Sequence, residues 1–208
     1  MKTNDERLND ILDRLERLHY VTPGDIPAID LYMDQVTTFM DTHLASCKRD
    51  EEDKILTKTM INNYAKNDLL PPPNRKKYTK DHILLLIFIY YYKNILSITD
   101  IGELLGPISD KYFRPDASPS LSQIYTEVFS MEQEQREHLK HDVIQKFESA
   151  KKTFSHLDAL PDEKEYLQLF SFLSELAFDV YLKKQMIEKI IDELRDEHKE
   201  IRDQKKKK

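Results

Sequence analysis

The chain is short of the residues that make tight turns and covalent cross-links. Its 208 residues include only 3 glycines, no tryptophan and a single cysteine, Cys47. Few glycines leave few of the tight hairpin turns that sheet proteins use, and one cysteine excludes an internal disulfide. The longest apolar run, residues 83–92, is about half of the ~20 residues that cross a bilayer. Since no apolar leader segment opens the chain either, we expect a mainly helical, cytoplasmic protein without a membrane span.

Acidic and basic residues are unevenly distributed along the chain. The whole protein has a formal net charge of -6. Residues 54–93 contain eight bases and only two acids, which gives this segment +6 and leaves -12 for the remainder. A local positive field inside an acidic protein is typical of a polyanion-binding patch. The alternative is a solvated face with no partner, and charge alone favours neither.

Apolar residues recur at helical spacing through most of the chain. The breaks between these patterns fall at residues 21–30, 47–54 and 107–120, which are rich in proline or in charge. In the last pattern the apolar residues alternate three and four apart over several heptads. This spacing is typical of a helix that packs on another long helix, in the same chain or in a second copy. We predict helices at residues 3–20, 32–47, 57–67, 80–93, 97–106, 121–129, 130–154 and 161–202.

The short helix predicted at residues 57–67 has two contrasting faces. Thr57 suits its N-cap, and Ile61, Tyr64 and Ala65 fall on one side. The opposite side carries Lys58, Thr59, Asn62, Asn63 and Lys66. Asparagine pairs bidentately with adenine, lysine reaches guanine or phosphate, and threonine does either or contacts a thymine methyl. These side chains are typical of a helix that reads DNA, and also of any exposed polar helix face.

The order of segments around this helix resembles the DNA-binding domain of the MerR family of transcription regulators. That family has a reading helix with a tyrosine before an xGLLxP segment, a basic wing ending in Arg-Tyr, an apolar helix and an sLxxIxxLL helix. Here the four parts read YAKNDLLPPP, NRKKY, TKDHILLLIFIYYYK and SITDIGELL. The resemblance covers about a quarter of the chain. The chain as a whole also resembles uncharacterised bacterial proteins built on the same core.

The resemblance implies a winged helix-turn-helix with the short helix in the major groove of double-stranded DNA. Arg75, Lys76 and Lys77 in the wing would contact phosphates, and Tyr78 would anchor the wing. The resemblance also implies a homodimer, with the last helix as the candidate coiled coil that sets two reading helices ~34 Å apart. The family has a glycine where this chain has Asp68, so we expect a left-handed backbone there to cost more.

We therefore predict an all-α, mainly helical fold. Its core would be a winged helix-turn-helix with flanking long helices and at most a short β-wing. The predicted parts are an N-terminal helix and linker at 1–29, the winged domain at 30–106, a linker at 107–120 and a helical region at 121–208 that holds the coiled-coil-like helix. The boundary at 107 rests on Gly106 and Pro107, which are typical of a helix end.

The motifs of common catalytic sites are missing from the chain. It has no Gly-rich phosphate loop and no CxxC, HExxH or GxSxG, so we expect neither enzyme activity nor a cofactor. His138 and His141 share a helix face, but without a third fixed ligand we expect a solvated surface and no metal. Tyr90, Tyr91 and Tyr92 could line an effector pocket, and we prefer the alternative that they pack in the core.

Two functions remain after these exclusions. The first is a sequence-specific DNA-binding transcription regulator, in which the polar face of the short helix reads or flanks bases and the wing holds phosphates. The alternative is a non-catalytic protein-interaction module that keeps the winged fold without binding DNA. Asp68, Asn62 and the acidic remainder of the chain favour this alternative.

Overall fold

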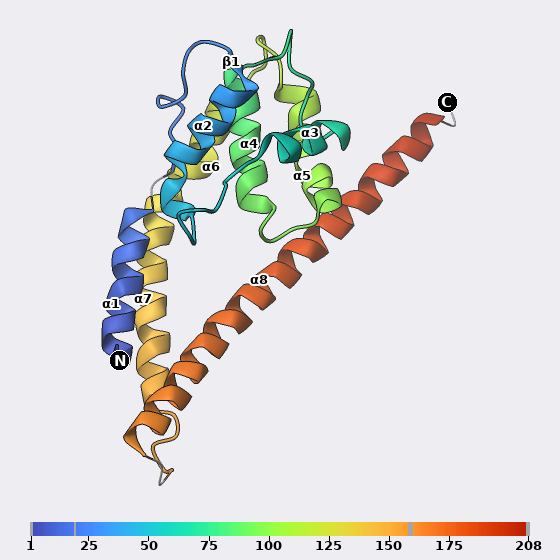
Figure 1. Cartoon of the computed structure of the whole chain (residues 1–208). Coiled ribbons are helices and arrows are strands. Elements are labelled where there is room, and N and C mark those ends of the chain that lie inside the picture. The colour runs from blue at the N-terminus through green and yellow to red at the C-terminus, as the bar shows by residue number, and fades with distance from the viewer. Residues whose placement is uncertain (1, 19, 158–159, 207–208) are drawn as a thin grey trace. The chain divides into compact units, whose positions relative to one another are not determined.

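The chain is mainly helical, as predicted, in a computed structural model that describes residues 2–18, 20–157 and 160–206. The elements in chain order are α1 (Asn4–Arg17), β1 (Leu31–Tyr32), α2 (Met33–His43), the 3-10 turn η1 (Ala45–Cys47), α3 (Lys58–Lys66), β2 (Lys77–Tyr78), α4 (Lys80–Tyr92), α5 (Ile98–Tyr112), α6 (Leu121–Ser130), α7 (Glu132–Lys151) and α8 (Pro161–Lys206) (Figure 1). The two strands form one small antiparallel sheet. Contacts divide the chain into two compact units: unit 1 is residues 1–18 with 130–185, and unit 2 is residues 19–129 with 186–208.

Unit 1 consists of α1, α7 and the first part of α8. α1 begins in a capping box, in which the Thr3 hydroxyl accepts a hydrogen bond from the Glu6 backbone N–H at 3.2 Å and the Glu6 carboxylate accepts one from the Thr3 N–H at 2.7 Å. This exchange satisfies two donors that a helix start leaves open. Asn4 ties α1 to α8, because its side-chain amide donates to the Glu165 carbonyl at 2.9 Å. The small core of this unit is made of Val143, Phe147, Ala150 and Phe172.

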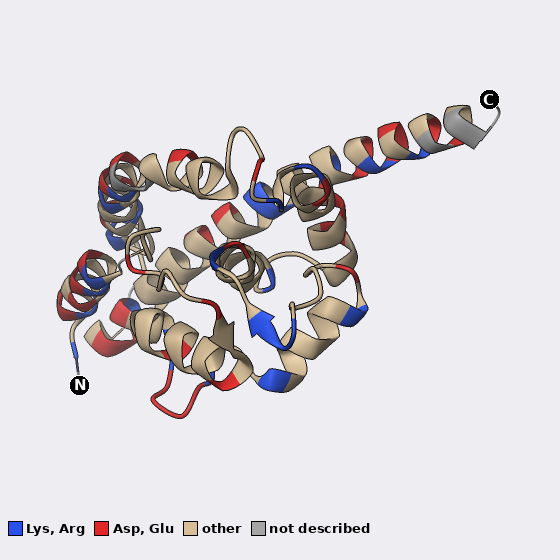
Figure 2. Ribbon diagram, turned by 90° about the horizontal axis from the view of Figure 1, so that it is seen from above, with Lys and Arg blue, Asp and Glu red and all other residues tan. Residues whose placement is uncertain are grey.

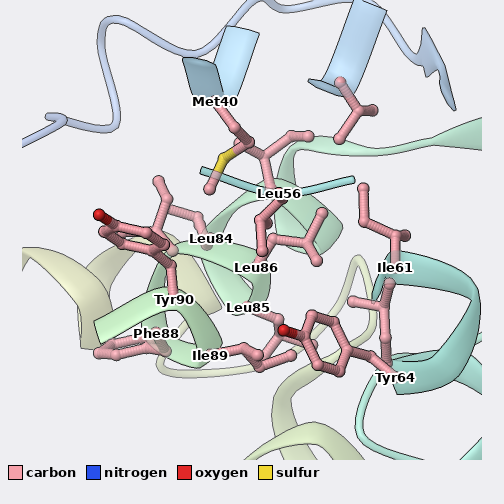
Figure 3. Close-up of a cluster of buried hydrophobic side chains, with 14 of the residues drawn as sticks. Met40, Leu56, Ile61, Tyr64, Leu84, Leu85, Leu86, Phe88, Ile89 and Tyr90 are labelled. Carbon is pink, nitrogen blue, oxygen red and sulfur yellow. The ribbon is translucent and has the colours of Figure 1, made fainter. Parts of the chain in front are cut away.

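α4 is the centre of unit 2. Every residue from His82 to Tyr90 is buried, so apolar side chains lie all around the helix. A helix of this kind must be covered on each side, and the core of the unit accordingly includes residues of α2, α3, α5 and α6. Figure 3 shows Met40 of α2 and both Ile61 and Tyr64 of α3 pointing into the cluster that α4 forms. This packing fixes which face of α3 is left for solvent.

α5 is longer than the sequence predicts. We expected the helix to end before Pro107 and residues 107–120 to form a linker, but α5 continues to Tyr112. A proline inside a helix removes one backbone donor, at a cost of ~3 kcal/mol. The apolar spacing nevertheless continues across it, since Leu105 is buried and Ile108 packs on the same core. Burying such side chains stabilises the fold by ~1.5–3 kcal/mol each, which offsets the missing hydrogen bond.

The last part of α8 packs on α5 within unit 2. Ile191 is buried in the core of that unit. Two polar contacts flank it: the Arg195 guanidinium donates to the Asp100 carboxylate at 2.5 Å, and the Nδ1 atom of His198 lies 3.1 Å from the Glu103 carboxylate. Part of the apolar face of α8, which the sequence predicts to pack on another helix, is therefore covered by α5 of the same chain.

Candidate nucleic-acid interface

α3 divides into a buried and an exposed face, as its sequence predicts. The Thr57 hydroxyl caps the helix by accepting a hydrogen bond from the Met60 N–H at 3.2 Å. Ile61 and Tyr64 are buried against α4. The reading face of α3, by which we mean its five exposed polar residues, consists of Lys58, Thr59, Asn62, Asn63 and Lys66. The two-faced geometry is confirmed, and the role of these residues stays a prediction.

The end of α3 is held by a turn that requires a left-handed residue. Asp68 has φ 55°. The Asp68 N–H donates to the Ala65 carbonyl at 3.3 Å, and the Leu69 N–H donates to the Tyr64 carbonyl at 2.9 Å. These two bonds form a Schellman motif, in which glycine is the usual left-handed residue. The left-handed backbone expected at Asp68 is therefore present, and the chain tolerates an aspartate there.

Buried side chains fix α3 just beyond that turn. Leu69 and Leu70 are both buried in the core of unit 2. Leu69 reaches α5 at Gly102, where an added Cβ would lie only 3.3 Å from a Leu69 methyl carbon. Gly102 thus allows α5 and the end of α3 to approach closely. The C-terminal end of α3 is consequently fixed on the core of unit 2.

The basic segment before β2 forms a tight turn, which we call the wing turn (Asn74, Arg75, Lys76 and Lys77). The Lys77 N–H donates to the Asn74 carbonyl at 2.9 Å. Both central residues are left-handed, with φ 50° at Arg75 and 66° at Lys76. A turn with two such residues is of the primed kind, which normally uses asparagine and glycine. Arg75 and Lys76 are both exposed, so the turn presents two cations at its tip.

The wing turn is anchored through the strand that follows it. β2 pairs with β1 in antiparallel register, with Leu31 opposite Tyr78 and Tyr32 opposite Lys77. Tyr78 is only 4% exposed, and burial raises the pKa of its hydroxyl. The Tyr78 ring meets the edge of the His82 ring, at 5.4 Å between centroids. Tyr78 is therefore an internal anchor of the wing turn, whereas Lys77 is only partly buried.

His82 connects the wing base to the core. It is 2% exposed, and its Nδ1 atom accepts a hydrogen bond from the Thr79 N–H at 3.0 Å. Its ring also meets the edge of Phe113 at 4.7 Å between centroids. Burial disfavours the charged imidazolium and lowers the pKa of His82, while the nearby carbonyls of Pro72 and Pro71 act in the opposite direction. A neutral His82 thus caps α4 from inside the core.

An exposed aromatic residue lies beside the wing turn. The sequence predicts that a helix begins at residue 32, but Tyr32 precedes α2 in β1 and is 49% exposed. The Lys77 ammonium lies 5.3 Å from the centroid of the Tyr32 ring, within the range of a cation–π contact. Sequence reasoning missed this residue because the pairing of β1 with β2 joins segments 45 positions apart. The alternation of Leu31 and Tyr32 is too short to signal a strand.

The basic residues of this region have no acidic partners within the described residues. We call Lys58, Lys66, Arg75, Lys76 and Lys77 the interface cations. In the described ranges none of them forms an ion pair. By contrast, several lysines of unit 1 do, including Lys140 with Glu16 at 3.1 Å and Lys151 with Asp5 at 3.0 Å. Figure 2 shows the blue of β2 and its preceding turn, and the blue at the ends of α3, in the same part of unit 2.

Acidic residues approach this surface near both ends of α3. A hollow of about 610 Å³ lies between α2, the loop before α3 and the start of α3. Its lining includes Glu51, Glu52 and Asp53 as well as Lys58 and Thr59. Carboxylates therefore lie close to the first cation of the reading face. At the other end, the exposed Asp68 follows Lys66 by two residues.

Of the three adjacent tyrosines, Tyr90 is buried in the core as expected, whereas Tyr91 and Tyr92 are only partly buried and pack against it. Tyr90 is 7% and Tyr125 1% exposed, and Tyr125 donates its hydroxyl hydrogen to the Val21 carbonyl at 2.6 Å. Burial, with a smaller contribution from the Cys47 thiol, raises the pKa of Tyr90 to about 12. Rings of Phe88 and Phe129 complete the cluster. These aromatic residues stabilise the core of unit 2.

The described residues form neither a metal-ligand cluster nor a membrane-spanning helix. Among residues 2–18, 20–157 and 160–206, no three His, Cys, Asp or Glu side chains are grouped to hold a metal ion. His138 and His141 lie exposed on α7. Over the same part of the chain, no helix combines the length and apolarity that crossing a bilayer requires.

A second surface lies on the first part of α8. We define the α8 seam as Tyr166, Phe170, Leu173, Ala177 and Val180, which follow one another four and three residues apart and are all exposed. A different side of the same helix faces the core of unit 1, where Phe172 is buried and Leu169 and Leu176 pack around it. A row of this kind is the pattern of one strand of a coiled coil. The described part of unit 1 leaves it uncovered.

The first segment of unit 2 matches a recognised protein family. Residues 21–129 match the family described as "Domain of unknown function (DUF1836)", which is more than half of the chain. The protein therefore belongs to the DUF1836 family. No curated protein and no solved structure is similar enough to this chain to count as a match. Because the family has no assigned function, the resemblance to MerR regulators stays a prediction.

Proposed function

We propose that this protein is a cytoplasmic, sequence-specific DNA-binding transcription regulator. In this proposal α2 and α3 act as a helix-turn-helix, α3 lies in the major groove, and the wing turn holds the phosphate backbone. The resemblance of residues 60–105 to the MerR family supports the arrangement. The observation that carries the proposal is the pair of cations at left-handed positions in the wing turn.

The wing turn places Arg75 and Lys76 in a left-handed backbone conformation that these residue types disfavour. A left-handed conformation costs ~1–2 kcal/mol for a residue with a Cβ atom, and asparagine and glycine avoid most of this cost. Arg75 and Lys76 occupy both positions, and neither is engaged by a carboxylate of the described chain. Backbone strain that persists is often linked to function. Cations held outward on a rigid turn suit a dense polyanion such as DNA.

The reading face has the dimensions and chemistry of a groove-binding element. An α-helix with its side chains is ~10–12 Å wide, and the major groove of B-DNA is ~12 Å wide. The exposed amides of Asn62 and Asn63 can meet base edges, and Lys58 and Lys66 at the helix ends can reach phosphates. The wing turn and α3 are held by one core, so both can contact the same duplex.

We propose in addition that the protein acts as a homodimer through the α8 seam. Pairing two copies would bury apolar side chains such as Phe170 and Leu173 that are exposed in one copy. The helix carries Asp162 and Glu163 in its first turn and Lys183 about six turns later. An antiparallel pair would bring the acidic end of each seam to the basic end of its partner. Two reading faces per complex fit a two-part operator.

The proposal is tested by fluorescence anisotropy on labelled genomic fragments with a salt titration. The double substitution Lys76→Ala/Lys77→Ala should weaken binding to all sequences alike and flatten the slope of log K against log [salt] by about 2, since two phosphate contacts are lost. Asn62→Ala should mainly change which sequence is preferred. The proposal fails if no fragment binds more tightly than competitor DNA at low salt.

One observation favours the second candidate, a protein-interaction module that keeps the winged fold. The carboxylates of Glu51, Glu52 and Asp53 line the hollow that Lys58 and Thr59 also line, and carboxylates repel a phosphate backbone. A pull-down with the full chain separates the two functions. A protein captured through the wing turn, together with no retention on DNA, would support the interaction module.

A further inference from the structure

We propose that the centre of the reading face recognises A·T base pairs. This inference deepens the proposed function and rests on it, because it names the class of DNA that α3 would select. It follows from which hydrogen-bonding groups are free on α3 and from how far each can reach. The two residues that carry it are Asn62 and Asn63.

The carboxamides of Asn62 and Asn63 are free to bind a ligand. Both residues are exposed, and within the described ranges neither side chain forms a hydrogen bond with the protein. Three other asparagines behave differently: the side-chain amides of Asn4, Asn67 and Asn94 donate to backbone carbonyls at 2.9, 2.7 and 3.2 Å. Asn9 and Asn74 are exposed and likewise form no side-chain hydrogen bond among the described residues, so what distinguishes Asn62 and Asn63 is that they lie next to each other on the exposed face of α3.

A free carboxamide discriminates among the bases. Its oxygen accepts from the N6 amino group of adenine while its nitrogen donates to N7, a pairing that no other base offers at the major-groove edge. Guanine presents two acceptors there, which suit the two donors of an arginine or the ammonium of a lysine. α3 contains no arginine. The fork that most often reads guanine is therefore missing from this helix.

Position along the helix separates the readers from the flanking cations. Thr59 precedes Asn62 and Asn63 by three and four residues, and Lys66 follows them by four and three, so these four lie in one row on α3. Threonine and asparagine are short, so they contact bases only where the helix axis comes close to the groove floor. Lysine is long and flexible and reaches phosphates from the helix ends. The short central residues would then define the sequence that is read.

Thr59 supports the same assignment, because it could contact the thymine that pairs with the adenine on the opposite DNA strand. Its side chain is exposed on the reading face and carries a methyl group next to its hydroxyl. A threonine methyl packs on the C5-methyl of thymine, which lies at the major-groove edge of an A·T pair. The amides of Asn62 and Asn63 would therefore select adenine and the Thr59 methyl would select thymine, so all three favour an A·T pair. Lys66 at the end of the row is left for a flanking phosphate or guanine.

The experiment uses the full-length protein and chemically altered duplexes. Selection from a random duplex pool defines the preferred site. Each adenine of that site is then replaced by 7-deazaadenine, which lacks the N7 acceptor, and each thymine by uracil, which lacks the methyl. We expect one or two adenines at which 7-deazaadenine weakens binding by about 5- to 100-fold, and a smaller loss for uracil beside them.

Variants assign these losses to residues. Asn62→Ala or Asn63→Ala should weaken binding to the unmodified site, and 7-deazaadenine at the matching position should then cause no further loss. Asn9→Ala, an exposed asparagine of α1, is the matched control and should behave as the unaltered protein does. Asn62→Arg should shift the selected base from adenine to guanine.

The outcomes separate this inference from the function on which it rests. If the protein binds no duplex better than competitor, the proposed function fails and the base assignment fails with it. If the protein binds DNA but selects G·C pairs at the positions sensitive to Asn62 and Asn63, only the base assignment fails. It also fails if no 7-deazaadenine substitution changes the affinity of the unaltered protein.

Discussion

The backbone N–H of Lys77 donates to the carbonyl of Asn74 at 2.9 Å and closes a turn whose two central residues, Arg75 and Lys76, are left-handed. Replacing them by residues that prefer this conformation should therefore raise stability. For Arg75→Asn/Lys76→Gly we expect an increase of ~1 kcal/mol in the free energy of unfolding, read from urea denaturation. DNA affinity should fall at the same time, because two cations are removed.

The predicted rise in stability together with a fall in DNA affinity is what ties the wing turn to DNA binding. If the wing turn did not contact DNA, the substitution would raise the free energy of unfolding without lowering DNA affinity. Arg114→Asn, which removes an exposed arginine outside the turn, should leave the free energy of unfolding within about 0.5 kcal/mol of its original value. A decrease in stability on replacing Arg75 and Lys76 would contradict the strain argument.

Asp68→Gly should stabilise the protein at the end of α3. Asp68 has φ 55° in the Schellman motif, where glycine carries no Cβ penalty, and we expect a gain of roughly 0.5–1 kcal/mol. The same substitution in the middle of a helix should have the reverse effect. Asp13→Gly, exposed in α1, should cost about 0.3 kcal/mol, because glycine lies about 1 and aspartate about 0.7 kcal/mol below alanine in helix propensity. Equal effects at the two positions, measured by urea denaturation, would argue against a strained Asp68.

Tyr32 should support DNA binding through Lys77. The ring lies 5.3 Å from the Lys77 ammonium and limits where that cation can point. An exposed contact of this kind contributes ~0.5–1 kcal/mol, so Tyr32→Leu should weaken DNA binding about 2- to 5-fold in anisotropy titrations. Tyr32→Phe keeps the aromatic ring and should bind nearly as the unaltered protein does. If Tyr32→Phe and Tyr32→Leu lose the same affinity, the hydroxyl rather than the ring is responsible.

Stability should fall as the pH drops from 7 to 5, partly because of His82. Burial lowers the pKa of His82 in the folded protein, whereas in the unfolded chain it is near 6.5. Below that pH the unfolded chain takes up the proton first, so the free energy of unfolding decreases until the folded pKa is reached. His82→Asn keeps an acceptor for the Thr79 N–H and removes the titrating ring. Its urea midpoint should be lower at pH 7 and should change less between pH 7 and 5.

A surface histidine provides the comparison for that pH profile. His138 is exposed on α7 and lies outside the core that surrounds His82. His138→Asn should leave the pH dependence of the urea midpoint as it is in the unaltered protein. An equally steep profile in His82→Asn would show that other groups cause the loss at low pH.

The α8 seam should determine the oligomeric state. Leu173 belongs to the seam and is 53% exposed in one copy. Placing a charge there would leave a buried unpaired cation at the centre of a dimer, so Leu173→Arg should convert dimer to monomer in light-scattering measurements. Leu182→Arg is the matched control, since Leu182 is 59% exposed but lies off the seam, and it should leave the dimer intact. The reverse pattern would move the interface to another face of α8.

Much of the fold follows from periodicity in the sequence. The apolar residues around α4 predict a helix covered on every side, and Thr57 predicts the start of α3 to the residue. The two faces of α3 were predictable for the same reason, because a helix repeats every 3.6 residues and neighbours three or four apart must share a face. The extent of α5 was not, since Pro107 argues locally for a helix end.

What sequence alone established is therefore local: which segments are helical, which side chains share a face, and where positive charge collects. The folded chain revealed the position of Tyr32 beside Lys77 and the left-handed pair in the wing turn. It also revealed that the interface cations form no ion pair with any residue that the structure describes. Each depends on segments distant in sequence or on a backbone conformation that its residues do not prefer. Such choices are settled by the burial of Tyr78 and its neighbours in a common core, because packing outweighs the ~1 kcal/mol preferences of single residues.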